Sequence, residues 1–319
     1  MACKCVRVHT DRVLHRPASC VRVHGPCIAH CPPVAEPCVA AYAASMRKRT
    51  GAVVCPGCGK LVDVNERVCP YCGRTAPGMF GYGPALQRFV GGFDLSMAVI
   101  GGCVVLYVIS LLIDPRAIFR MAGLFDILAP TSGALAVLGM TGAFAMAEGR
   151  WWTLLTAVFL HGSLLHLLFN MAIGRRYLTD VVQLYGAARA WVIFIVAGVA
   201  GFALSNFAAG VPTIGASGSI FGLLAALIVY GRRTHQHAVA QQLWMSAGVM
   251  FLFGFFMSGV NNWAHAGGFA GGFVAAEALS FAGRRESRVL VGAAWGSVLL
   301  VLVAFGLQLS RLVGALLGR

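Results

Sequence analysis

The chain has 319 residues, of which 58% are hydrophobic and 11% are charged. An average globular chain carries about 25% charged residues, so this composition excludes an ordinary soluble domain and indicates a membrane protein. The net charge of +14 does not indicate nucleic-acid binding, because the Lys and Arg residues fall between apolar segments, where the positive-inside rule places them. We therefore expect the lipid bilayer as the surroundings of the chain and no nucleic-acid partner.

Residues 1–45 differ from the rest of the chain. They contain six of the eleven cysteines and four histidines, with scattered Pro and Arg and no apolar periodicity. This composition predicts a disordered extension, or a start codon assigned too early, since Met46 and the basic run after it would make a natural bacterial N-terminus. Metal binding is the alternative for these residues. No signal peptide is visible.

Residues 51–74 contain two matched Cys-x-x-Cys-Gly motifs, one at Cys55 and Cys58 and the other at Cys69 and Cys72. Each motif offers two thiolates to one tetrahedral zinc ion, and its glycine permits the tight turn. About twenty residues cannot bury a core, so zinc would supply the folding energy of this segment. We predict a zinc ribbon with a closed, structural site on the cytosolic side, where thiols stay reduced. Such a ribbon can bind a cytosolic partner, and residues 75–92 are expected to form a linker.

Seven apolar segments follow, each near the roughly 20 residues that a bilayer requires. They are Leu95–Ile113, Thr153–Ile173, Ala187–Phe207, Ser217–Tyr230, Leu243–Val260, Trp263–Ala282 and Val289–Leu309. The fold class is therefore an all-α polytopic membrane protein. The segment Asp114–Trp152 contains prolines and glycines and is predicted to be an interfacial loop with short helices. The fourth span is short, as expected for a helix that begins below the membrane surface.

The distribution of arginines predicts the orientation. The loops after the second, fourth and sixth spans carry Arg175, Arg176, Arg189, Arg232, Arg233, Arg284, Arg285 and Arg288, whereas the loops after the third and fifth carry no Lys or Arg. The positive-inside rule places the charged loops, and with them the N-terminus, in the cytosol. Seven spans then place the C-terminus outside. We expect a multi-pass protein of the bacterial cytoplasmic (inner) membrane.

A glycine-rich turn, Gly215-Ala216-Ser217-Gly218, opens the fourth span. A serine at such a turn places its hydroxyl at a helix end, where free backbone N–H groups lie nearby. On its own the pattern also fits a serine that caps a membrane helix. Polar residues in other spans favour a reactive site, because such residues are costly in a membrane and usually functional. They are His161, His166 and Asn170 in the second span and His265 in the sixth.

The spacing of these residues allows roles to be assigned. His166 and Asn170 are four residues apart and share one helix face. We predict that Ser217 is the nucleophile and that His265 is its general base. Glu277 lies roughly 18 Å from His265 along a helix at about 1.5 Å per residue, so the pattern indicates a dyad without an acidic third member. The backbone N–H of Ser217, His166 and Asn170 are the expected oxyanion donors.

At this point the chain resembles the rhomboid family of intramembrane serine proteases. The residues that carry the resemblance are His166 and Asn170 in HxxxN, Ser217 in GASG, and Ala264, His265, Gly268 and Gly272 in AHxxGxxxG. Gly268 and Gly272 also form a small-xxx-small pattern that lets a neighbouring helix approach closely, and the fourth span is the natural neighbour. Phe221, one turn after Ser217, is expected either to pack on the His265 ring or to be a core or lipid-facing aromatic.

The resemblance implies a six-helix core over residues 93–282 and a seventh helix within residues 283–319. It also implies a serine endopeptidase that cuts single-span or other membrane proteins near the outer face without a cofactor for catalysis. Gly215, Gly218, Phe221 and His161 would support the site. Two departures stand out. Thr153 follows Trp151-Trp152 where the family often has Arg, and Phe221 replaces a frequent Tyr. The first departure predicts a different anchoring of the loop, and the second leaves the ring stacking but removes a hydroxyl.

Two other classes remain open. A catalytically silent rhomboid-like chaperone or receptor would bind transmembrane helices, but such proteins typically lack the serine or the histidine that this chain has. A transporter with polar midplane residues predicts internal repeats, and no convincing repeat is present.

Overall fold

The structure is a computed structural model that describes residues 50–55, 59–73, 75–78, 94–115, 123, 127–257, 259–279 and 287–316. The chain divides into two compact units, Met1–Val90 and Gly91–Arg319, which we describe separately. The predictions for residues 1–45, for Cys58 and for most of the 75–92 linker lie outside the described residues.

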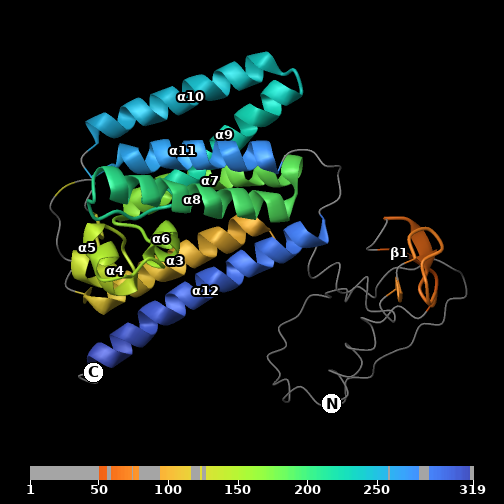
Figure 1. Ribbon diagram of the computed structural model, residues 1–319, viewed down its shortest axis with the longest axis horizontal. Coiled ribbons are helices and arrows are strands. Elements are labelled where there is room, and N and C mark those ends of the chain that lie inside the picture. Colours follow the sequence, from red (N-terminus) through yellow and green to blue (C-terminus); the bar gives the residue numbers. More distant parts are fainter. Residues whose placement is uncertain are drawn as a thin grey trace, which may run out of the picture. The chain divides into compact units, whose positions relative to one another are not determined.

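The described part of the first unit is a small hairpin. Strand β1, Ala52–Val54, pairs antiparallel with β2, Leu61–Asp63, and Val53 lies opposite Val62 (Figure 1). Gly59 and Gly73 follow the two cysteine motifs, and both have φ of 70°, a left-handed conformation that glycine adopts at little cost. Each glycine N–H donates to the first cysteine carbonyl of its motif, at 2.8 and 2.9 Å. The two motifs thus form matched turns.

The second unit is helical, and its described part contains ten α-helices and one short 3-10 helix. In chain order these are α3 (Leu95–Ile113), α4 (Ser132–Leu138), α5 (Ala143–Ala147), α6 (Thr153–Thr156), η4 (Ala157–Phe159), α7 (Leu164–Tyr185), α8 (Ala187–Ala208), α9 (Ser217–Arg233), α10 (His237–Phe256), α11 (Asn262–Ala278) and α12 (Arg288–Leu316). The long helices lie side by side, and α4 and α5 lie at the end where α10 passes into α11 (Figure 1). The predicted all-α class and the short helices of the 114–152 segment are confirmed.

Helix α9 lies at the centre of this unit, in contact with α7, α8, α10 and α11. Small residues allow the closest approach. A Cβ on Gly268 would overlap the backbone of Gly218, and a Cβ on Gly272 would overlap the backbone of Gly222. The two backbones touch over a full helical turn, and this contact fixes the distance between the start of α9 and the start of α11.

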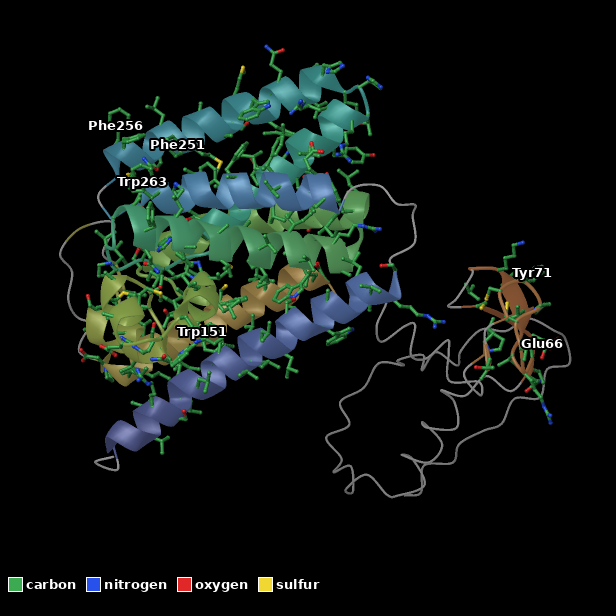
Figure 2. All side chains as sticks on the ribbon, viewed as in Figure 1. Glu66, Tyr71, Trp151, Phe251, Phe256 and Trp263 are labelled. Atoms are coloured by element: carbon green, nitrogen blue, oxygen red, sulfur yellow. The ribbon has the colours of Figure 1, made fainter. Side chains whose placement is uncertain are left out.

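Within the described residues, four helices are long and apolar enough to cross a membrane, namely α3, α8, α10 and α12, and the bent pair Thr153–Phe159 plus Leu164–Tyr185 would make a fifth. The protein is therefore a multi-pass integral membrane protein. Helices α9 and α11 have 17 residues each, somewhat fewer than the roughly 20 that span a bilayer. The exposed aromatic residues Phe256 and Trp263 lie where α10 passes into α11 (Figure 2), as is typical of a membrane–water interface.

The prediction of a single second span over Thr153–Ile173 was wrong. The helix axis turns by 91° between Phe159 and Leu164, and α7 then continues to Tyr185. Ser163 causes the new start, because its side chain accepts a hydrogen bond from the His166 N–H at 3.2 Å as an N-cap. The preceding residues instead form α6 and η4 beside the site.

Candidate active site

Ser217 is the first residue of α9 and is partly exposed, whereas most of α9 is buried. The turn before it depends on Gly215, whose φ of 119° disfavours any side chain. A Cβ on Gly215 would also lie 2.8 Å from His166 Nε2, inside van der Waals distance. The Gly215 N–H donates to the Ala157 carbonyl of η4 at 2.9 Å. These contacts fix the chain that leads into Ser217.

His265 lies in the first turn of α11 and is 7% exposed. Its Nε2 is 2.9 Å from the Ser217 Oγ, which is hydrogen-bonding distance for a nucleophile and its base. The Phe221 ring stacks on the imidazole, with centroids 4.5 Å apart and planes inclined by 22°. The close approach of α9 and α11 is what brings together two residues 48 positions apart.

Asn262, which the sequence analysis did not identify, completes the surroundings of His265. Its Oδ1 lies 3.2 Å from His265 Nδ1. With the ring hydrogen on Nδ1, the imidazole donates to this amide oxygen and keeps Nε2 as the acceptor that faces Ser217. The available signal was the spacing, since residues three apart on a helix are neighbours. The next residue back, Asn261, caps α11 by accepting from the Trp263 N–H at 3.1 Å.

His166 and Asn170 lie on one face of α7, as their spacing requires. The Gly162 N–H lies 3.3 Å from His166 Nδ1, so Nδ1 acts as an acceptor and the ring hydrogen of the neutral imidazole is on Nε2. Asn170 is 6% exposed and donates from Nδ2 to the His166 carbonyl at 2.8 Å. This leaves one amide hydrogen of Asn170 for another acceptor. Both side chains therefore retain a donor.

A cavity of about 590 Å³ contains these groups. Ser217, His265, His166 and Asn170 all contribute to its lining. The cavity extends between α7 and α10, where apolar side chains line it, including Phe169, Ile173, Met250 and Phe253. It thus combines a polar end that holds the serine and histidines with an apolar side between two helices.

His161 lies behind this cavity rather than in its lining. It is fully buried, its ring centroid is 5.1 Å from that of His166, and neither of its ring nitrogens has a hydrogen-bond partner within the described residues. Gly218 and Gly268 contribute through the close contact of their helix backbones. These residues shape the site without lining its polar end.

Thr153, the first residue of α6, stands where the family often has arginine. Thr153 is fully buried, and its hydroxyl donates to the Arg150 carbonyl at 2.7 Å and lies 3.1 Å from Thr141 Oγ1. The arginine of the segment before α6 is instead Arg150, whose Nε forms an ion pair with Glu148 at 2.9 Å. The segment before α6 is thus held by the buried Thr153 hydroxyl and by the ion pair of Arg150 with Glu148.

In the first unit, Cys55, Cys69 and Cys72 bring their sulfur atoms within 4.8 Å of one another. The Sγ atoms of Cys55 and Cys72 are 3.8 Å apart. Zn–S bonds of about 2.3 Å in a tetrahedron imply sulfur atoms about 3.8 Å apart. The three described thiols therefore fit a tetrahedral zinc ion.

Comparison with known proteins identifies the domain that holds the site. Residues 148–281 match the family model described as the Rhomboid domain. The chain contains a rhomboid domain. This segment includes every residue of the candidate active site, from His161, which precedes α7, and His166 on α7 to His265 on α11.

Curated relatives agree with the domain match. Rhomboid protease GluP of Bacillus subtilis is 34% identical over 177 residues, which are 54% of this chain and 34% of the relative. RHOMBOID-like protein 7 of Arabidopsis thaliana is 33% identical over 155 residues, 46% of this chain and 49% of the relative. Inactive rhomboid protein 1 of Danio rerio is 33% identical over 140 residues, 42% of this chain and 16% of the relative. The chain thus spans half or less of the length of these relatives.

Proposed function

We propose that this rhomboid protein is an intramembrane serine endopeptidase that works through Ser217 and His265. The observation that carries the proposal is the 2.9 Å separation of Ser217 Oγ and His265 Nε2 within a cavity that also exposes two donor side chains. The Asn262 oxygen beside Nδ1 favours the tautomer in which Nε2 can accept a proton. A serine that merely capped α9 would not need a buried, oriented imidazole at hydrogen-bonding distance.

The chemistry follows from this geometry. His265 Nε2 accepts the hydroxyl proton as Ser217 Oγ attacks the carbonyl carbon of the scissile peptide, which forms a tetrahedral oxyanion. The oxyanion collapses, the C–N bond breaks, and His265 returns the proton to the leaving amine. In the second half of the reaction, His265 takes a proton from a water molecule as the water oxygen attacks the acyl carbon. The bond from that carbon to Ser217 Oγ then breaks, and His265 returns the proton to Oγ. No cofactor takes part in these steps.

The donors at the polar end of the cavity suit the oxyanion. The backbone N–H of Ser217 belongs to the first turn of α9, where helix N–H groups lack intrahelical partners. His166 Nε2 and the second amide hydrogen of Asn170 are the side-chain donors. Such preorganised donors stabilise charge that exists only in the transition state, so they should act on kcat more than on KM.

Membrane proteins with a single span are the substrates that the cavity suits best. The apolar side of the cavity between α7 and α10 can accept an unwound segment of a substrate helix from the lipid. The carbonyls of a helix are bonded within it, so the segment must unwind before attack. Small residues such as glycine lower that cost, by about 1 kcal/mol relative to alanine. We expect cleavage near the outer end of such spans.

A catalytically silent rhomboid-like protein is the alternative, since one relative carries the printed name Inactive rhomboid protein 1. The intact Ser217–His265 pair favours the protease.

The decisive experiment is hydrolysis of a single-span substrate by the purified full chain in proteoliposomes. Ser217→Ala and His265→Ala should each abolish cleavage while the protein still inserts and folds. The matched control is Ser219→Ala, which removes a buried hydroxyl two residues along the same helix that has no partner within the described residues. Cleavage by Ser217→Ala at the wild-type rate would refute the proposal.

We further propose that Cys55, Cys58, Cys69 and Cys72 bind one structural zinc ion, which would hold the two cysteine motifs together. The division into a ribbon over 51–74, a core over 93–282 and an added helix within 283–319 is part of the same proposal. We also propose a bacterial cytoplasmic membrane as the location, and the arginine-rich loops support an orientation with the N-terminus in the cytosol and the C-terminus outside. Accessibility labelling of single cysteines in the loops on either side tests that orientation.

A further inference from the structure

Helix α12 carries a buried polar side chain far from the serine. Gln308 is 6% exposed, whereas its neighbours Leu307 and Leu309 are exposed as expected for lipid-facing residues. A buried amide in a membrane helix is costly unless its groups are hydrogen-bonded. The described part of α12 contacts α4, α6 and α8, so Gln308 faces the short helices beside the site.

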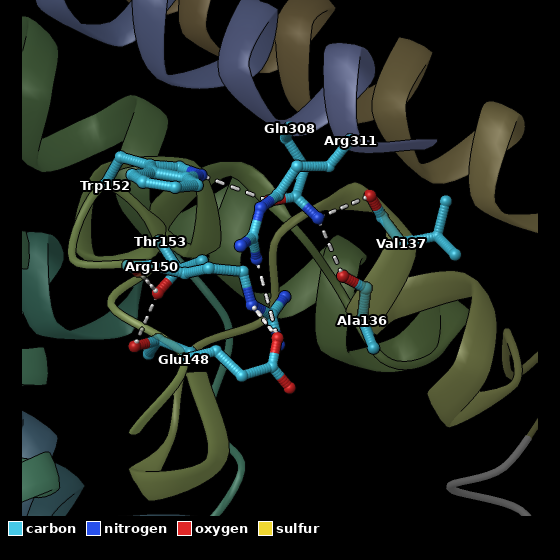
Figure 3. A network of polar contacts seen from close by, with 9 residues as sticks. Ala136, Val137, Glu148, Arg150, Trp152, Thr153, Gln308 and Arg311 are labelled. Carbon is cyan, nitrogen blue, oxygen red and sulfur yellow. Dashed lines mark hydrogen bonds and ion pairs between the residues drawn. The ribbon is translucent and has the colours of Figure 1, made fainter. Parts of the chain in front are cut away.

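Gln308 uses both ends of its amide (Figure 3). Its Nε2 donates to the carbonyls of Ala136 at 3.0 Å and Val137 at 2.8 Å, and its Oε1 accepts from Trp152 Nε1 at 3.2 Å. Ala136 and Val137 lie in the last turn of α4, and the Ala136 carbonyl also accepts from the Gly139 N–H at 3.2 Å. One side chain therefore joins the end of α4 to the tryptophan that precedes α6.

Arg311, one turn further along α12, contacts the same loop. Its guanidinium lies 3.5 Å from Glu148 and 5.6 Å from the centroid of the Trp152 ring. Both Arg311 and Glu148 are about half exposed, and exposed ion pairs contribute little to stability. The buried amide of Gln308 is therefore the main contact.

The segment held by Gln308 is hydrogen-bonded to the chain that leads into Ser217. Three residues after α4, Thr141 pairs with Thr213: the Thr213 N–H donates to the Thr141 carbonyl at 2.8 Å, and the Thr141 N–H donates back at 3.3 Å. Thr156, from α6, donates to the Gly139 carbonyl at 2.8 Å. Thr213 lies four residues before Ser217. These hydrogen bonds thus connect the end of α4 to the turn that presents Ser217.

Thr213 also contacts the start of α11, the helix that carries His265. Asn261 Nδ2 donates to Thr213 Oγ1 at 2.9 Å and to Ser205 Oγ at 2.6 Å. Asn261 is the N-cap of α11, four residues before His265. A shift of Thr213 would therefore move both members of the Ser217–His265 pair.

We propose that Gln308 is a positioning residue for this pair, and that α12 is a working part of the enzyme because it fixes the α4–α6 loop against the segment before Ser217. This inference rests on the proposed function. Misplacing reacting groups by about 1 Å can cost about 10²-fold in rate. Gln308 acts on the pair only indirectly, through the contact of Thr141 with Thr213 and that of Thr213 with Asn261. We therefore expect a smaller loss, of about tenfold in kcat, with little change in KM.

The test compares two substitutions on α12. Gln308→Met keeps the length and volume of the side chain but removes its hydrogen bonds to the loop. Ser297→Ala removes the hydrogen bond in which Trp191 Nε1 donates to Ser297 Oγ at 2.8 Å, a contact of α12 with α8 far from the loop. We expect Gln308→Met to lower kcat about tenfold and Ser297→Ala to leave it unchanged, although both loosen the attachment of α12.

Two further measurements separate position from stability. The rate at which a fluorophosphonate probe labels Ser217 should fall in parallel with kcat, and thermal unfolding monitors the fold. Trp152→Phe removes the donor to Gln308 Oε1, so its effect should not add to that of Gln308→Met in a double-mutant cycle. Additive effects, or an equal loss in Ser297→Ala, would show a general weakening of α12 and overturn the positioning role.

The outcome also distinguishes this inference from the proposed function. If the wild type cleaves and labels while Ser217→Ala does neither, an unchanged Gln308→Met refutes the positioning role alone. A wild type that neither cleaves nor labels would overturn both.

Discussion

In the small unit, two of the five residues that form the buried cluster are cysteines, whereas in the helical unit 13 of the 17 residues of α9 are buried among other helices. The described part of the cysteine unit has little apolar surface to exclude from water, so we expect its fold to depend on zinc bound by the thiols. The helical unit depends on close contact between helix backbones. Metal removal should therefore unfold the small unit and leave the helical unit intact, whereas substitutions at the helix contacts should destabilise the helical unit.

Zinc removal should produce the largest effect. Structural zinc contributes apparent binding free energies of about 10–16 kcal/mol in small zinc domains, so a strong chelator should unfold residues 51–74 completely. We expect hydrogen exchange in the ribbon to become fast while α9 and α11 stay protected, and cleavage of a single-span substrate to remain within about twofold, because the helical core is packed independently.

The cysteine controls sharpen that experiment. Cys69→Ser should lower the zinc content, whereas Cys103→Ala, at a buried position in α3, should leave zinc content unchanged. A full chain that holds no zinc by mass spectrometry would refute the ribbon, and loss of cleavage together with zinc would contradict the independence of the two units.

The next largest effect is expected at the polar end of the helical unit. Asn170→Ala removes a proposed oxyanion donor, and loss of one such donor typically lowers kcat about 10²–10³-fold, or about 2.7–4 kcal/mol. KM should change little, since the charge develops only in the transition state. Thr179→Ala, on the same helix, removes a hydroxyl that donates to Ser96 Oγ at 3.3 Å away from the cavity, and should keep the wild-type kcat. An effect of Asn170→Ala on KM alone would contradict the donor role.

Packing of the helical unit is tested by a single methyl group. Gly272→Ala places a Cβ against the backbone of Gly222, and overpacking of this kind costs about 1–3 kcal/mol. Gly296→Ala makes the same change on α12, where no atom lies within 4 Å of the added Cβ, and it should stabilise the helix by up to about 1 kcal/mol. Equilibrium unfolding in mixed micelles measures both. Equal effects at the two positions would show that the contact of α9 with α11 is not decisive.

The sequence predicted most of the helical unit because its signals are local. Apolar length indicates a span, the GASG turn places Ser217 at a helix start, and the glycines at 268 and 272 predict the partner of α9. The break after Phe159 escaped hydropathy because the apolar composition continues through it, and only the Ser163 cap marks the new helix. The contact between Gln308 and α4 joins residues more than 170 positions apart, and no local pattern reports such a pairing.

Asn262 was missed for a related reason and supports the smallest of the expected effects. An acidic partner of His265 would stand out in an apolar span by its charge, whereas a neutral amide three residues away carries no charge signal. The structure puts its Oδ1 3.2 Å from His265 Nδ1. A neutral hydrogen bond contributes about 0.5–1.5 kcal/mol net, which corresponds to about tenfold in rate or less. We therefore expect Asn262→Ala to lower kcat by up to about tenfold and to leave KM unchanged.

The physical reason is the orientation of the imidazole rather than its charge. Without the Asn262 oxygen, the ring can place its hydrogen on either nitrogen and rotate away from Ser217, so only part of the population has Nε2 ready to accept the proton. Labelling of Ser217 by a fluorophosphonate should slow by the same factor as kcat, because both need the same ring. Trp263→Phe, at the exposed neighbouring position, is the control and should leave both rates unchanged. If Asn262→Ala slowed cleavage but not labelling, its effect would lie in substrate binding, and the orienting role would be refuted.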